Sequence, residues 1–133
     1  MLYSKSAKYA IKSLTSLVGL SQDQYRTAGE VAECQEVPAD FLSKIFQRLA
    51  KEGLLDSQKG RGGGFRLERP AEEISLLEIV HAVDGEDVFH RCPFDTRNCD
   101  PKEPCPLHQD WKPIRDQIVG FLEQKKISDL VQE

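Results

Sequence analysis

Residues 27–67 read TAGEVAECQEVPADFLSKIFQRLAKEGLLDSQKGRGGGFRL, and their pattern specifies the architecture of the chain. Thr27 with Glu30 forms a capping box that predicts a short helix, and Pro38 suits the first turn of the next one. The apolar residues of that next helix recur with helical spacing: Phe41, Leu42, Ile45, Phe46 and Leu49. Gly53 then stands where a glycine typically ends a helix. This segment predicts two helices joined by a tight turn.

A hairpin is predicted directly after these helices. Residues 54–58 and 65–67 have strand character and flank the glycine-rich run 60–64, which predicts a glycine-tipped pair of strands. An amphipathic helix over about 4–19 precedes the quoted segment. Helix, short helix, turn, helix and hairpin is the order of a winged helix-turn-helix domain. We therefore expect a mainly α fold with a small β wing.

The C-terminal half divides into three parts. Ser75 with Glu78 is a second capping box, and it opens a helix that ends at Gly85. Residues 88–110 lack periodicity and contain four of the seven prolines and three of the four cysteines. A last long helix follows, with Pro113 in its first turn. We predict a DNA-binding domain over 1–85, a cysteine-rich metal-cluster loop over 86–110 and a C-terminal dimerisation helix over 111–133.

The net charge of −4 hides an asymmetry between the two halves of the chain. Residues 1–69 carry eleven Lys and Arg against eight Asp and Glu, whereas residues 70–133 carry seven against fourteen. Phosphate binding depends on where positive charge lies, so the N-terminal half is the candidate DNA-facing half. No apolar run approaches the length of a membrane span, and the N-terminus lacks the pattern of a signal peptide. We expect a cytoplasmic protein with no membrane partner.

The helix over 38–52 is the predicted recognition helix, because a helix fits the major groove of DNA. Its exposed side would present Asp40, Ser43, Lys44, Gln47, Arg48 and Lys51. Hydroxyl, amide and amine groups can bind base edges, whereas Arg48 and Lys51 suit phosphates. The wing would add Lys59, Arg61 and Arg66 beside the glycine tip, where a cation could enter the minor groove. Taken alone, these charges could also be a solvated helix face.

The cysteine loop contains a full set of soft-metal ligands within residues 92–108. Three thiols and one imidazole make up this set: Cys92, Cys99, Cys105 and His108. The spacing leaves an iron–sulfur cluster and structural zinc equally open. His90 is a spare ligand candidate, and Cys34 is interpreted as a small, partly buried apolar residue. No nucleophile–base pair is present, so no enzyme is predicted.

The chain resembles the IscR and NsrR family of bacterial winged-helix iron–sulfur regulators over nearly its whole length. The resemblance is carried by Ser4-Lys5, Tyr9-Ala10, the segments 41–54, 60–67 and 74–80, the three loop cysteines, His108, Trp111 and Gly120-Phe121-Leu122. It implies a homodimer on a double-stranded DNA operator, with the first and last helices in the dimer contact. It also favours an iron–sulfur cluster over zinc.

Within that family, the fourth ligand differs between members, and it decides the cluster that we expect here. IscR-like members place a histidine two residues after the third cysteine, as His108 stands here, and carry [2Fe-2S]. NsrR-like members, which bind [4Fe-4S], take a ligand from the partner's N-terminal helix, where this chain has Lys5 and Lys8. We expect a repressor that senses cluster supply, redox state or nitric oxide through [2Fe-2S]. A zinc- or thiol-switched repressor and a small iron–sulfur electron carrier are the alternatives.

Overall fold

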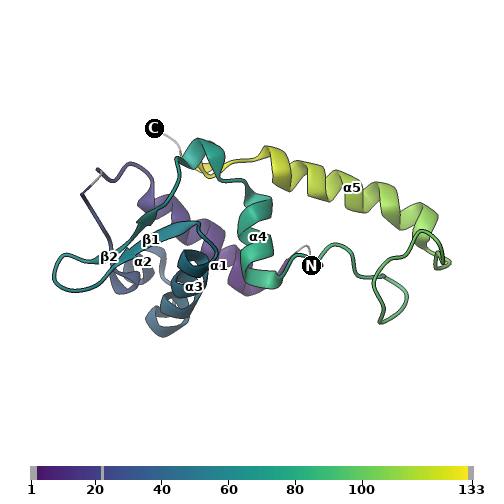
Figure 1. The fold of residues 1–133 in the computed structure, drawn as a ribbon, viewed down its shortest axis with the longest axis horizontal. Coiled ribbons are helices and arrows are strands. Elements are labelled where there is room, and N and C mark those ends of the chain that lie inside the picture. Colours follow the sequence, from purple (N-terminus) through teal and green to yellow (C-terminus); the bar gives the residue numbers. More distant parts are fainter. Residues whose placement is uncertain (1–2, 22, 132–133) are drawn as a thin grey trace.

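The computed structural model describes residues 3–21 and 23–131, and its elements follow the predicted order. In chain order they are α1 (Lys5–Leu14), η1 (Thr15–Leu17), α2 (Ala28–Gln35), α3 (Ala39–Lys51), β1 (Leu55–Gln58), β2 (Gly64–Leu67), η2 (Ala71–Glu73), α4 (Leu76–Asp84), α5 (His108–Gln124) and η3 (Ile127–Leu130). Figure 1 shows α1 to α4 and the two strands gathered at one end, with α5 extending away from them. The predicted class, mainly α with a small β wing, is confirmed.

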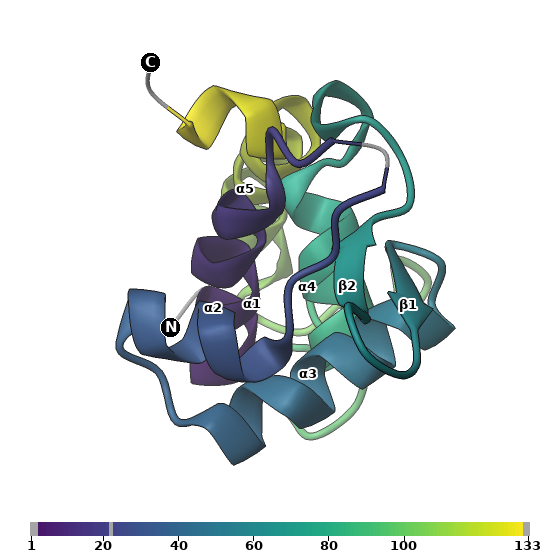
Figure 2. The same cartoon turned by 90° about the vertical axis from the view of Figure 1, so that its left-hand side faces the viewer.

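The core lies where α1 crosses α3 and α4, as Figure 2 shows from the side of the wing. Ala7, Ala10 and Leu14 on α1 are fully buried. Small alanine side chains let the neighbouring helices approach α1 closely, and interior packing of this density leaves little room for larger residues. The other helices contribute side chains that are equally inaccessible: Leu42, Phe46 and Leu49 on α3, and Ile79 and Val80 on α4.

Helix α1 is shorter than predicted. It ends at Leu14 and continues as the 3-10 turn η1 to Leu17, instead of running as one helix to Gly19. Gly19 has a φ of +87°, a left-handed conformation that glycine adopts without a steric penalty and that ends helical geometry. The predicted apolar stripe of α1 is buried in the core of its own chain.

The turn between α2 and α3 is built from local contacts. The Thr27 hydroxyl accepts a hydrogen bond from the backbone N–H of Glu30, which starts α2 at the predicted place. Glu36 ends that helix in the left-handed conformation, with a φ of 57°. Pro38 is the N-cap of α3 with extended backbone, so it immediately precedes the first turn rather than lying within it. A left-handed residue followed by a proline makes the change of direction abrupt.

The wing is the antiparallel pair of β1 and β2, in a register that sets Leu55 opposite Leu67 and Gln58 opposite Gly64. A third segment joins its edge, because the backbone of Arg26 exchanges hydrogen bonds of 3.0 and 2.7 Å with that of Phe65. The Phe65 ring meets the Phe46 ring edge-on at 5.3 Å between centroids. This contact links the wing to α3.

The C-terminal part returns to the winged domain through α4. The capping box of Ser75 and Glu78 is present as predicted, and Gly85 follows the last turn of α4. After α5 the chain comes back to this capping segment, where the N–H of Ile127 donates to the carbonyl of Ile74 at 2.9 Å. Ile127 is fully buried there. This contact fixes the C-terminal end of α5 against the base of α4.

Helix α5 begins at His108, earlier than the predicted Trp111, so its first turn takes in part of the sequence assigned to the cysteine loop. As a consequence Pro113 lies inside the helix and not in its first turn. Of the residues in α5, only Leu122 is buried. Among the residues that the structure describes, no helix combines the length and the apolar character needed to cross a membrane.

The edge of the wing yields a test of the fold. A Cβ added to Gly64 would collide with the carbonyl oxygen of Arg26, and the backbone of Gly64 has a φ of +136°. We expect Gly64→Ala to lower the free energy of unfolding by at least about 1 kcal/mol, because both the backbone and the space exclude a side chain. Gly29→Ala is the control, since its Cβ would meet only ordinary contacts; it should raise stability by about 0.5–1 kcal/mol. Urea unfolding followed by circular dichroism measures both, and equal stabilities would contradict this account of the wing.

Candidate functional site

The outer face of α3 carries most of the predicted DNA-reading residues. Asp40, Lys44, Gln47 and Lys51 are exposed, and Ser43 is half-buried. The Gln47 side-chain amide lies 3.4 Å from the Ser43 hydroxyl, so these two polar groups form one patch on the helix. Leu42, Ile45, Phe46 and Leu49 face the opposite way into the core, whereas Phe41 of the predicted apolar stripe is 39% exposed. The exposed hydrogen-bonding groups of α3 therefore lie on a helix face that can enter the major groove of DNA.

Arg48, which the sequence predicts as a phosphate ligand, is exposed and also has a partner within the protein. Its Nε donates a hydrogen bond of 2.7 Å to the backbone carbonyl of Ala82, close to the C-terminal end of α4. Carbonyl groups at a helix C-terminus lack intrahelical partners and attract cations. Arg48 therefore ties α3 to α4, and Lys44 and Lys51 are the exposed cations of α3 without such a contact among the described residues.

The tip of the wing presents Lys59 and Arg61, both exposed as predicted. Gly60 and Gly62 beside them have φ values of 92° and 78°, which fit the tight turn that glycine permits. The backbone of the tip can therefore come close to a ligand while the two cations extend from it. Among the predicted wing cations, these two remain open to solvent.

Arg66, also predicted to face DNA, has partners within the protein. Its Nε donates to a carboxylate oxygen of Asp56 at 2.9 Å, and its guanidinium lies 4.8 Å from the centre of the Tyr25 ring. The Tyr25 hydroxyl donates to the same Asp56 oxygen at 2.8 Å. This hydrogen bond and Arg66 hold the pKa of Asp56 below its usual value, and the same bond raises the pKa of Tyr25. Arg66 thus serves the inner structure of the wing.

Sequence reasoning missed Tyr25 and Arg26. Both precede the α2 cap, and they pair with the wing through side chain and backbone. Arg26 is exposed where the wing meets the start of α2. The Thr27 cap was a usable signal for this position, because it places the preceding residue at the N-terminal end of a helix. The Tyr25–Asp56 contact spans 31 positions and has no local signal.

The cysteine loop is folded as a narrow hairpin at its N-terminal side. Arg91 pairs with Asn98, the N–H of Cys92 donates to the carbonyl of Arg97 at 2.9 Å, and the N–H of Cys99 donates to that of His90. The His90 backbone thus helps to position Cys99, although the His90 side chain is exposed. This pairing brings the first two cysteines to the same hairpin despite their separation in sequence.

Among the four predicted ligands, the structure brings two into direct contact: Cys99 Sγ is 3.3 Å from His108 Nδ1 at the start of α5. The backbone N–H of Phe94, and also the Cys105 thiol, lower the pKa of Cys92, whereas burial raises that of Cys105. Within residues 3–21 and 23–131, no three His, Cys, Asp or Glu side chains converge as a metal site.

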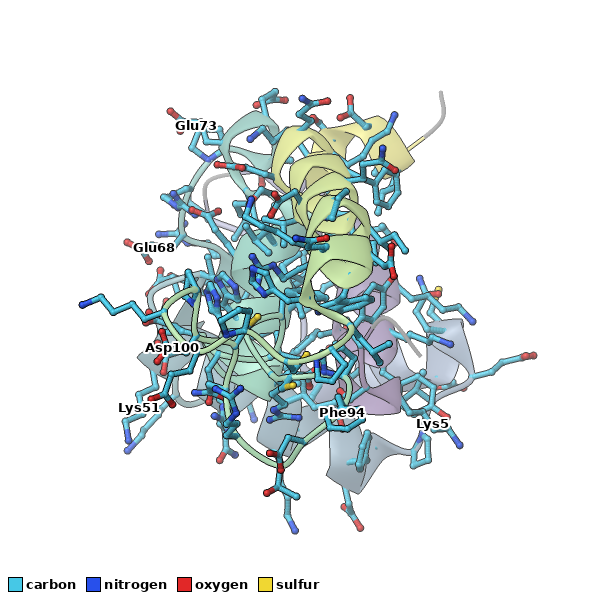
Figure 3. The ribbon with its side chains drawn as sticks, turned by 90° about the vertical axis from the view of Figure 1, so that its right-hand side faces the viewer. Lys5, Lys51, Glu68, Glu73, Phe94 and Asp100 are labelled. Atoms are coloured by element: carbon cyan, nitrogen blue, oxygen red, sulfur yellow. The ribbon has the colours of Figure 1, made fainter. Side chains whose placement is uncertain are left out.

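The chemistry of this loop nevertheless fits a soft metal or cluster. Backbone N–H groups directed at Cys92 stabilise a thiolate, the form that binds such metals. Trp111 lies one turn after His108, and its Nε1 is buried without a hydrogen-bond partner among the described residues. A buried donor normally has an acceptor, and sulfur can serve as one. Figure 3 shows the sulfur atoms near the start of α5, with Phe94 exposed beside them.

Cys34 differs from its predicted environment. It is exposed near the C-terminal end of α2 rather than partly buried. Its helix is packed on α1 and α3, far in sequence from the cysteine loop. Nothing in its surroundings groups it with the other three cysteines.

Comparisons with known proteins agree with this geometry. The family model described as Rrf2, iron-dependent transcriptional regulator, matches residues 3–133. The HTH-type transcriptional regulator IscR of Photorhabdus laumondii subsp. laumondii is 30% identical over 131 residues, which cover 98% of this chain and 79% of that protein. Two solved structures share the fold. The oxidized form of Staphylococcus aureus CymR has a TM-score of 0.76 at 25% identity, covering 100% of this chain and 98% of its own. The IscR of T. potens has a TM-score of 0.75 at 20% identity, covering 96% and 83%.

Proposed function

Because this chain belongs to the Rrf2 family of transcriptional regulators, we propose that it is a homodimeric repressor whose cysteine loop senses a signal through a bound iron–sulfur cluster. The observation that carries the proposal is the contact between Cys99 and His108 at the start of α5, with Cys92 and Cys105 in the same loop. The family match makes the chain a transcriptional regulator and not an enzyme, as predicted.

The ligand set favours [2Fe-2S]. Three thiolates and one imidazole would hold the cluster through Cys92, Cys99, Cys105 and His108, and the cluster would supply one-electron chemistry sensitive to oxidation and nitric oxide. A [4Fe-4S] cluster with a carboxylate from the partner's first helix is disfavoured, because the first turn of α1 has no acidic residue. Zinc remains the alternative metal for the same four ligands. The description of the family as iron-dependent supports iron over zinc.

The position of the loop gives it access to the DNA-reading helix. The loop begins at Gly85, directly after the last turn of α4, and that turn holds Arg48 of α3 through the Ala82 carbonyl. Asp84 in the same turn accepts a hydrogen bond of 2.9 Å from the backbone N–H of Ser4, at the start of α1. A loop that is ordered by its ligand and loose without it would move these anchors. We therefore propose that residues 1–85 bind DNA and the loop up to α5 controls them.

A thiol switch is the second candidate, and the presence of Cys92 and Cys105 as free thiols in one loop favours it. Hydrogen peroxide would oxidise the two thiols to a disulfide; each thiol loses one proton and one electron, and the hydrogen peroxide is reduced to two molecules of water. The structural relative CymR is described in an oxidized form. In this version Cys99 and His108 are not needed. An electron carrier is disfavoured, because it would leave the exposed face of α3 without a role.

The dimer proposal rests on α5 alone. Ile114 and Phe121 are 51% and 50% exposed, and Trp111 and Ile118 are half-buried. Apolar groups on one helix that leave this much area in water are typical of an interface. The first helix, which the sequence placed in the same contact, has its apolar residues buried within its own chain. We propose that α5 of one protomer packs on the partner's α5 about a two-fold axis.

The cluster proposal predicts a coloured protein. Anaerobically purified protein should contain about two iron and two sulfide per chain and absorb visible light. Replacing Cys99 by Ser should abolish the cluster, and His108→Ala should leave a more labile one, because one ligand of four is lost. Cys34→Ser is the matched control and should keep the full spectrum, since Cys34 is exposed on α2. Colourless protein with one zinc per chain would contradict the proposal. A colourless protein that forms a Cys92–Cys105 disulfide on peroxide treatment would favour the thiol switch.

The dimer proposal predicts that one charge on α5 separates the protomers. Ile114→Glu places a carboxylate in the proposed apolar contact, where burial of an unpaired charge is strongly unfavourable. We expect light scattering at micromolar concentration to show a dimer for the wild type and a monomer for this variant. Gln117→Glu is the control, because this exposed polar residue lies on the same helix. A monomeric wild type, or a dimeric Ile114→Glu protein, would count against α5 as the interface.

The DNA proposal separates phosphate binding from base reading. Lys51→Ala should weaken binding to operator and random DNA alike and reduce the salt slope by about one unit. Gln47→Ala should cost about 1–3 kcal/mol on an operator found by in-vitro selection and little on random DNA. Arg61→Ala should be most harmful on A·T-rich operators with a narrow minor groove. Anisotropy titrations at two salt concentrations measure all three. If all three variants lost affinity equally on every sequence, the division into phosphate-binding and base-reading residues would be refuted. If none of them lost affinity, α3 would not be the helix that enters the groove.

A further inference from the structure

The wing is held to the body of the domain by side chains as well as by its own strand pairing. Asp56 on β1 accepts hydrogen bonds from the Tyr25 hydroxyl at 2.8 Å and from the Arg66 guanidinium at 2.9 Å, both on one carboxylate oxygen. Arg66 on β2 also lies over the Tyr25 ring. Three side chains from three segments therefore close a ring of contacts, which we call the wing clamp.

The backbone next to the wing clamp reinforces it. Arg26, the neighbour of Tyr25, pairs with Phe65, the neighbour of Arg66, through two backbone hydrogen bonds. Phe65 in turn packs its ring on Phe46 of α3. The clamp thus lies between the segment that leads into α2 and the strands that carry the glycine tip. Loss of the clamp would leave the wing attached to the body through backbone pairing, the Phe65–Phe46 contact and the packing of Leu55 and Leu67 on the core.

The composition of the clamp suits positioning better than DNA contact. The Nε of Arg66 binds Asp56 and the flat face of its guanidinium packs on Tyr25, and the Arg66 side chain is 34% exposed. Asp56 places a carboxylate near the proposed DNA surface, where a negative charge opposes phosphate binding. A carboxylate at this place is accounted for by the two hydrogen bonds that it accepts. Its depressed pKa is consistent with a charged state at neutral pH.

We propose that Tyr25, Asp56 and Arg66 fix the angle between the wing and the recognition helix α3, and thereby set how well the wing tip discriminates among operators. This inference rests on the proposed DNA-binding function. It assigns the wing arginines to different tasks. Arg61 at the exposed tip contacts DNA, whereas Arg66 positions the tip without contacting DNA. The width of the minor groove differs among sequences by only a few ångströms. A change in wing angle therefore affects how the wing tip distinguishes groove widths more than it affects the general attraction to phosphates.

The first test removes one hydroxyl. Tyr25→Phe keeps the ring under Arg66 and deletes the bond to Asp56, so operator affinity should fall about threefold to tenfold, the range for one hydrogen bond. Affinity for random DNA should change less than twofold, and the salt slope should stay at the wild-type value. Tyr9→Phe is the matched control, because its ring packs on Phe41 and no hydrogen bond of its hydroxyl is seen among the described residues. It should bind as the wild type does.

The second test separates positioning from charge. Asp56→Ala removes a negative charge, so simple electrostatics predicts tighter binding to all DNA, whereas the clamp predicts weaker binding to the operator. Glu68→Gln removes an exposed charge from the residue after β2 and serves as the charge control. Arg66→Lys keeps the charge but loses the flat stacked group, so it should weaken operator binding with an unchanged salt slope. Tighter operator binding by Asp56→Ala, or full affinity of Arg66→Lys, would overturn the proposal.

A measurement without DNA distinguishes failure of the clamp from failure of the proposed function. Amide hydrogen exchange at Arg26 and Phe65 reports opening of the wing edge. It should be faster in Tyr25→Phe than in Tyr9→Phe, with unchanged exchange in the α1 core. If the wild type selects no operator, the DNA-binding proposal fails while this result still tests the clamp. Equal exchange in the two variants would refute the clamp even if the protein binds DNA.

Discussion

The contact between Phe46 and Phe65 is the point on which the DNA-facing half depends. Phe46 is fully buried on the inner side of α3, and burial of such a side chain contributes about 1.5–3 kcal/mol. Its edge-on contact with Phe65 adds about 0.5–1.5 kcal/mol and joins helix and wing across the core. This pair, together with Leu55 of β1 in the same core, joins the recognition helix and the wing into one surface. The exposed residues of both elements can then address one ligand together.

The last turn of α4 plays the same joining role on the other side. Its Ala82 carbonyl holds Arg48 of α3, its Asp84 carboxylate holds Ser4 at the start of α1, and the cysteine loop begins at Gly85. Such polar contacts each contribute little to stability in isolation. Their importance here is positional, because three segments with different tasks meet within one helical turn. The cysteine loop, for which we propose a sensing role, is thereby placed next to the elements proposed to read DNA.

Two of the predicted DNA-binding arginines have structural partners, and this changes the charge balance of the proposed interface. Arg48 and Arg66 use their Nε groups on a carbonyl and a carboxylate of the protein, so the exposed cations of the predicted set without such a contact among the described residues are Lys44, Lys51, Lys59 and Arg61. A surface with few free cations in an acidic chain depends more on shape and base contacts for affinity. The wing angle therefore gains weight in recognition. The extended α5, which is almost without buried residues, extends away from this surface and carries the proposed dimer contact.

The sequence alone determined the elements whose signals are local. The capping residues Thr27 and Ser75 act on backbone groups three positions away, the glycine tip requires positive φ, and helical spacing identifies the apolar face of α3. The ligand types of the cysteine loop are also a local property. The tertiary structure decided which side chains meet: Arg48 with Ala82, Tyr25 with Asp56, and Cys99 with His108. It also decided that the apolar residues of α1 are buried in the core of their own chain and that α5 begins at His108. These outcomes depend on the angles at which helices and strands pack, and packing angles arise from the fit of whole faces rather than from the spacing of residues along the chain.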